Sequence, residues 1–265
     1  MNQTQVKDIL LQLKEDVGEF TVIFSGKKST KVDGLYKPLT REIIIHNRNT
    51  EDPNAIVYTA IHEFAHHVHV SSSVVPVSRR AHTKEFWAIL HGLMDNAEKL
   101  KVYLNKFKSE SDFQALTMEI KDKFILKNGN LMKEFGRLLL QAYNLCNKHD
   151  MSFDDYVDRE LGLGRTAAKQ IMGVYREDIN PEVGYENMKT LSRIKPGEAR
   201  NKAEEAFLNG SSPDTVKNQF TSSAQSLEDP VLRLQKEKQR IERSIVNYNK
   251  RLAEIENSLL SMTEK

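Results

Sequence analysis

Residues 55–69 restrict the fold of this chain most, because a broad apolar helical face and a row of polar side chains share one segment. The apolar residues recur at helical spacing: Ile56, Val57, Ala60, Ile61, Phe64, Ala65 and Val68. A face of this width has to pack against other parts of the chain. The polar positions His62, Glu63 and His66 stand in the order HEFAH. The segment therefore predicts a buried helix with two histidines and a glutamate along one edge.

The spacing of these polar residues predicts a zinc site. Residues four apart lie on the same face of a helix, so the imidazoles of His62 and His66 can reach one ion. Glu63 lies one step round the helix, beside the open coordination position. There it can take a proton from metal-bound water and return it to a leaving amine. We therefore expect Zn²⁺ as cofactor and Glu63 as the catalytic base.

A catalytic zinc ion needs a third protein ligand and a position left open for water. The chain offers several downstream candidates: His67, His69, His82, Glu85 and His91. His82 is placed best, because it ends the loop at 71–80 and begins the next helical segment, 83–103. Glu85 is the reserve ligand, and His69 lies one turn beyond the pair. We expect His67, His69 and His91 at the surface or beside the ligands, and His46 in a structural role.

The rest of the first 106 residues predicts a small α+β unit. A helical pattern covers residues 3–16, and strand-like segments cover residues 20–24 and 42–46. Between them lies a turn-rich stretch around Gly26 and Gly34. We expect the strand at 42–46 to border the cleft as an edge strand, where an extended substrate pairs with it. A simple core strand is the alternative, since Ile43, Ile44 and Ile45 are all apolar, and the two roles are compatible.

Three segments carry a family resemblance. TAIHEFAHHV and the following HTKEFWAIL resemble the SprT-like and YgjP-like zinc metallopeptidases, and GLYKPLTREIIIHNR is similar to their strand region and to that of the ImmA/IrrE-type peptidases. The resemblance covers roughly residues 20–105 and implies a zincin-like fold. It also implies that His62, His66 and His82 are ligands and that Glu63 is the base. Thr83 stands where these families usually have glycine.

Residues 107–222 read as an all-α region of short helices with breaks near 128–130, 149–150, 180–181, 196–197 and 209–213. The stretch FDDYVDRELGLGRTAAKQIMGVYRE resembles a helix-turn-helix, and the segment after it is similar to ParB/KorB-like proteins. Arg165, Thr166, Lys169 and Gln170 would then face DNA. Asp158 departs from the small residue usual in the first helix. A helical bundle for packing or protein recognition is the alternative.

Residues 227–263 predict a coiled coil after a linker at 222–230. Apolar residues alternate at spacings of four and three: Leu227, Val231, Leu234, Ile241, Ile245, Tyr248, Leu252, Ile255, Leu259 and Met262, and only Lys238 interrupts them. A stripe this narrow and regular suits a partner helix, which predicts a homo-oligomer. The alternatives are an amphipathic helix packed on its own chain and an antiparallel hairpin with another helix.

The composition bears on the cellular compartment of the protein and on the partners it can bind. The 39 basic and 37 acidic residues leave a net charge of +2, so bulk charge does not favour nucleic acid. One cysteine, Cys146, cannot form an internal disulfide, which fits a reducing compartment. The N-terminal segment lacks the apolar core of a signal peptide, and no apolar run is long enough to span a membrane. We therefore expect a cytoplasmic protein.

Two functions follow from these observations. The first is a zinc metallopeptidase that hydrolyses peptide bonds in a protein or peptide substrate, either a DNA-associated protein or a regulator. The second is a DNA- or protein-binding adaptor with a structural zinc site, closed by a fourth ligand from His69 or Glu85. Glu63 favours the peptidase, because a structural site has no need of a base.

Overall fold

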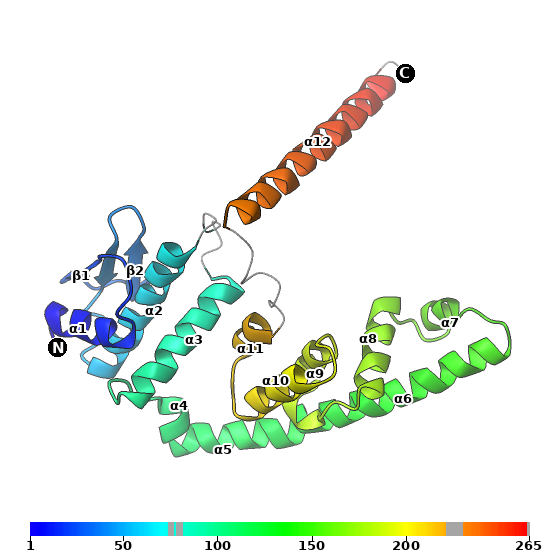
Figure 1. The fold of residues 1–265 in the computed structure, drawn as a ribbon, viewed down its shortest axis with the longest axis horizontal. Coiled ribbons are helices and arrows are strands. Elements are labelled where there is room, and N and C mark those ends of the chain that lie inside the picture. The colour runs from blue at the N-terminus through cyan, green and yellow to red at the C-terminus, as the bar shows by residue number, and fades with distance from the viewer. Residues whose placement is uncertain (74–76, 78–81, 221–229, 264–265) are drawn as a thin grey trace.

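The protein has an α+β fold, mostly helical, with one small mixed sheet (Figure 1). The computed structural model describes residues 1–73, 77, 82–220 and 230–263. Most of the loop predicted at 71–80 and of the linker predicted at 222–230 lies outside these residues. Leu227 of the predicted coiled coil lies outside them too.

The N-terminal unit sets three helices around a three-stranded sheet. The helices are α1 (Gln3–Leu13), α2 (Pro53–Ser72) and α3 (Lys84–Lys99), and the strands are β1 (Thr21–Phe24), β2 (Gly34–Lys37) and β3 (Glu42–Ile45). β3 lies in the centre, parallel to β1 and antiparallel to β2. α2 starts where the Asp52 carboxylate accepts a hydrogen bond from the backbone N–H of Asn54, with Pro53 at the first helical position.

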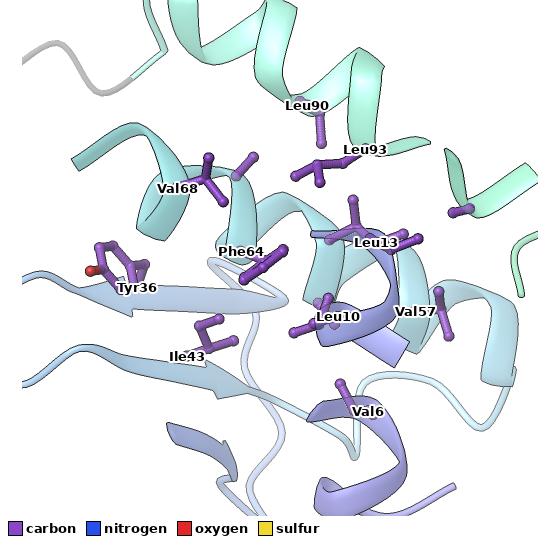
Figure 2. Close-up of a cluster of buried hydrophobic side chains, with 14 of the residues drawn as sticks. Val6, Leu10, Leu13, Tyr36, Ile43, Val57, Phe64, Val68, Leu90 and Leu93 are labelled. Carbon is purple, nitrogen blue, oxygen red and sulfur yellow. The ribbon is translucent and has the colours of Figure 1, made fainter. Parts of the chain in front are cut away.

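The core of this unit lies where α1 and α3 meet α2 and where α2 crosses β2 and β3 (Figure 2). Leu10 of α1, Ile43 of β3, Phe64 of α2 and Leu90 of α3 are all 2% exposed or less. Every apolar residue predicted on the broad face of α2 is buried. The apolar pattern of residues 55–69 therefore predicted correctly which face of this helix turns inward.

One strand expectation is wrong, and for residues 42–46 the core role is confirmed while the edge role is not. The turn-rich stretch around Gly34 contains a strand, β2, and this strand forms the edge of the sheet. The segment predicted at 42–46 is β3, the central strand, so both of its sides are hydrogen-bonded to neighbours. Its run of three isoleucines fits that central position, because Ile43 and Ile45 pack into the core and Ile44 is partly buried.

The helical region begins with α4 (Lys106–Ser109). It continues as one uninterrupted helical rod made of α5 (Ser111–Ile120), the π-helical turn η1 (Lys121–Leu126) and α6 (Lys127–Lys148). The break predicted at 128–130 is therefore wrong. Gly129 lies inside α6 and faces the backbone of Pro181, where a Cβ would collide. This glycine allows two segments to approach closely and does not end the helix.

The chain then turns back through shorter helices: α7 (Phe153–Arg159), α8 (Arg165–Arg176), η2 (Pro181–Val183), α9 (Tyr185–Leu191), α10 (Glu198–Leu208) and α11 (Pro213–Phe220). The other predicted breaks fall between these elements. α11 packs on α3, and the Ser212 hydroxyl that caps it lies 2.6 Å from Nδ1 of His91. The helical region thus returns to the unit that carries the histidine motif.

The last helix, α12 (Pro230–Thr263), runs without a break for 34 residues and projects away from the rest of the structure (Figure 1). None of the helices that the structure describes combines the length and apolar character needed to cross a bilayer.

Candidate metal centre

Two histidines of α2 and one from the segment just before α3 meet at one point. His62 and His66 lie on α2, and His82 lies two residues before α3. One ring nitrogen of each lies within 4.8 Å of the others, and Nε2 of His62 is 3.1 Å from Nε2 of His82. This is the combination predicted from the sequence, brought together across the loop at 71–80.

The donor set and its spacing fit a metal ion. Three imidazoles with a fourth position open form a donor set used by catalytic zinc. Zinc–nitrogen bonds of about 2.0–2.1 Å in a tetrahedral shell hold the ligand nitrogens about 3.3 Å apart. The observed 3.1 Å between His62 and His82 is close to that spacing. The three side chains can therefore hold one ion with small movements.

The ring of Phe86 in α3 packs against the imidazole rings of all three histidines. It is fully buried, and its ring centroid lies 4.2 Å from that of His66, 4.7 Å from that of His82 and 5.1 Å from that of His62. Trp87 flanks His82 at 5.8 Å on another side. Phe86 thus belongs to the core, and its ring also restricts how the imidazoles can turn.

The imidazoles of His62 and His66 are held in the neutral form that binds metal. Burial, together with the nearby His62, His82 and His69, lowers the pKa of His66 to about 4. Burial and His82 also lower the pKa of His62. Metal ligation requires the neutral ring, so these two ligands need lose no proton at neutral pH.

Glu63 has the environment of a general base. Its side chain is 7% exposed, and burial raises its pKa to about 7, an effect opposed by a hydrogen bond from the backbone of Tyr36. A base whose pKa lies near the working pH transfers protons most effectively. Glu63 lines the same cleft as the three histidines.

The cleft has a volume of about 750 Å³ and gives the site room for an extended ligand. The cleft is lined by residues of the β2 region, of α2 and of the segment between α2 and α3. These are Val32, Asp33, Gly34, Leu35, Tyr36, Pro38, Tyr58, Thr59, His69, Val70 and Val77, together with His62, Glu63, His66 and His82. Apart from His69, Gly34 and the predicted ligands and catalytic base, the sequence analysis did not single out these wall residues. Gly34 was assigned to a turn, although its place before the alternating Leu-Tyr-Lys could have indicated a strand.

The open edge of β2 faces this cleft. The backbone N–H of His46 donates to the carbonyl of Asp33, so the alternation of an antiparallel pair turns the backbone groups of Gly34 and Tyr36 outward. The backbone hydrogen bond from Tyr36 to Glu63 agrees with this direction. β2 therefore takes the place at the cleft that the sequence analysis had assigned to residues 42–46.

Gly34 leaves the space that Glu63 occupies. A Cβ at this position would lie 2.8 Å from Cγ of Glu63 and 2.8 Å from Cγ2 of Thr59. We expect Gly34→Ala to displace the carboxylate and to lower kcat/KM for peptide cleavage by about 100-fold, because a shift of about 1 Å in a reacting group has that cost. Bound metal should stay unchanged.

The measurement is kcat/KM and metal content for this variant beside Gly92→Ala, the same substitution in α3, where a Cβ meets nothing within 4 Å. The control should keep parental values. Equal activity in the two variants would show that the contact with Gly34 does not position Glu63.

The remaining histidines have different environments. His67 is fully buried, with the Tyr36 hydroxyl 3.0 Å from Nδ1 and the Gly18 carbonyl 2.9 Å from Nε2. It is a core residue, so a surface position for it is wrong. His69 is also buried, and its Nδ1 has no hydrogen-bond partner among the described residues. His46 bonds the Ser25 hydroxyl at 2.8 Å, as a structural residue would.

Neither Glu85 nor His69, the other candidate ligands, belongs to the histidine cluster. Among the described residues the cluster consists of His62, His66 and His82 alone. Oε1 of Glu85 lies 3.6 Å from Nζ of Lys84. The negative charge of Glu85 raises the pKa of His69, but burial has the larger effect and lowers that pKa.

The four residues predicted to face DNA lie on α8, remote in sequence from the cleft. Arg165 and Lys169 are exposed, but they form ion pairs of 2.8 Å and 3.0 Å with Asp158 and Asp154 of α7. Thr166 is exposed and Gln170 is half-buried. Acidic side chains thus offset the positive charge of this face, and DNA contact stays a prediction.

Comparisons with protein-family models, curated proteins and solved structures found no significant match for this chain.

Proposed function

We propose that this protein is a zinc-dependent metallopeptidase with a zincin-like N-terminal domain and a cytoplasmic place of action. The observation that carries the proposal is the convergence of His62, His66 and His82 beside a buried glutamate in a cleft open to solvent. Three ligands leave one coordination position for water and substrate, as catalytic zinc requires.

The chain's own residues support hydrolysis of a peptide bond. When bound, zinc supplies a Lewis acid that polarises a carbonyl and lowers the pKa of water. Glu63 accepts a proton from the attacking water and then donates it to the leaving amine. The open edge of β2 offers the backbone groups of Gly34 to an extended substrate strand, which would lie across the cleft.

The site favours a peptidase over an adaptor with a structural zinc site. A structural site is usually closed by four protein ligands, and neither His69 nor Glu85 joins the cluster. Among the described residues no cation forms an ion pair with Glu63, and a buried carboxylate in that environment is costly to maintain in a purely structural site. The substrate, either a DNA-associated protein or a regulator, follows from the family resemblance alone.

The test is metal content and activity on the full-length protein. We expect about one zinc ion per chain and cleavage of an unfolded protein such as casein. A chelator should abolish the cleavage, and added zinc should restore it. Zinc without cleavage of casein or of a DNA-bound protein would favour the adaptor, and absence of zinc would refute the metal site.

A further inference from the structure

Helix α12 presents a long apolar stripe to solvent. Six side chains lie along it: Leu234, Ile241, Ile245, Tyr248, Leu252 and Ile255, which are 41–75% exposed. No other described element packs along this helix. An exposed apolar surface of this extent marks an interaction site, and its regular spacing of three and four residues fits another helix.

We propose that the occupant is α12 of a second copy of this chain, paired antiparallel over the full length of the helix. The alternation of spacing assigns Lys238, Ile245 and Leu252 to the first core position of each heptad. It assigns Leu234, Ile241, Tyr248 and Ile255 to the second core position. The charges in and beside this stripe select the orientation.

A parallel pair brings like charges together. Equivalent core residues face each other in a parallel dimer, so Lys238 would meet Lys238 of the second copy in the apolar seam. Glu237 would also lie across from Glu242 of the second copy, once on each side. Only Arg251 and Glu256 would form an attractive pair. Like charges placed in contact at an interface disfavour that arrangement.

The antiparallel pair removes these conflicts. With both helices overlapped end to end, Ile241 packs on Leu252 of the second copy and Ile245 packs on Tyr248. Lys238 packs its stem on Ile255, and its ammonium lies beside Glu256 of the second copy, on the same side of the seam. Within the described part of the single chain, Lys238 has only a loose contact of 3.7 Å with the exposed Glu242. The antiparallel pair therefore gives this cation a partner.

This arrangement separates the two metal centres. A helix of 34 residues is about 51 Å long at 1.5 Å per residue. In the antiparallel pair the two N-terminal ends of α12, where the rest of each chain is attached, lie at opposite ends of this rod. This step rests on the proposed function: two catalytic units held apart in this way would reach separate sites of one extended target, which would raise the effective affinity for it.

The first test is the mass of the full-length protein in light scattering. We expect twice the chain mass of 30.4 kDa for the parent and a single chain for Ile245→Glu. Val246→Glu is the matched control, because this neighbour lies off the stripe and is 65% exposed. It should stay dimeric. A monomeric parent, or equal masses for the two variants, would overturn the proposal.

The second test distinguishes the orientations by disulfide formation. Lys238→Cys and Ile255→Cys are made in separate chains of different size, and the parent, whose Cys146 is buried, serves as control. The antiparallel pair predicts crosslinks in the mixture and none in either variant alone. A parallel pair predicts crosslinks in each variant alone. That result, or a mixture that does not crosslink, overturns the orientation or register without bearing on the peptidase proposal.

Discussion

Replacing Glu63 by glutamine is expected to lower peptide hydrolysis by roughly 10²–10⁴-fold, the contribution typical of a positioned general base. Glutamine keeps the length of the side chain and can still accept the hydrogen bond from the backbone of Tyr36. It cannot take a proton from water. Because Glu63 does not belong to the ligand cluster, bound zinc should stay near its parental level. Single-turnover kinetics and metal analysis on the same preparations measure both effects.

Glu85→Gln is the matched control for this variant. It makes the same chemical change on a half-buried glutamate outside the ligand cluster, at the start of α3. We expect parental activity for it. Should the Glu63 variant keep its activity, another group must act as the base, and the mechanism proposed for this cleft would be wrong.

The local part of the site could be predicted from the sequence because a helix fixes it. Residues four apart on one helix face must be neighbours, so the pairing of His62 with His66 could be predicted without knowing how the rest of the chain folds. His82 was less determined. Its loop could place it in several ways, and the packing of Phe86 against the rings decides among them.

The sheet was harder to predict, because its strands have four residues each and their order depends on contacts distant in sequence. A run of isoleucines indicates a buried strand but does not tell a central position from an edge. Gly34 and Gly129 were both assigned to turns or breaks. In the structure each one permits close packing, against Glu63 and against the backbone of Pro181. A glycine pattern alone does not separate these two uses.

The contact between α11 and α3 could not have been foreseen either. Ser212 and His91 are more than 100 residues apart, and their hydrogen bond of 2.6 Å depends on the turn-back of all the intervening helices. Since α3 also carries Phe86 beneath the ligands, the helical region is packed on the helix that supports the metal centre.

Replacing His82 by alanine is expected to weaken zinc binding by well over about 100-fold. Changes to residues that only orient a ligand already lower metal affinity by 10–100-fold, and the loss of one ligand of three should exceed that range. His62 and His66 would remain on α2, one protein ligand short of the three that a catalytic zinc site uses. Peptide cleavage should disappear at zinc concentrations that saturate the parent, and a competition titration with a chromogenic chelator gives the affinity.

Two further variants separate this result from a general loss of packing. Glu85→Ala and His69→Ala remove the other two candidate ligands, which lie outside the histidine cluster, and both should keep zinc affinity within a few-fold of the parent. Thermal unfolding of the metal-free proteins should show little change for His82→Ala, because its side chain is exposed. If Glu85→Ala loses zinc instead and His82→Ala retains it, the third ligand is Glu85, since only one of the two residues can then complete the site.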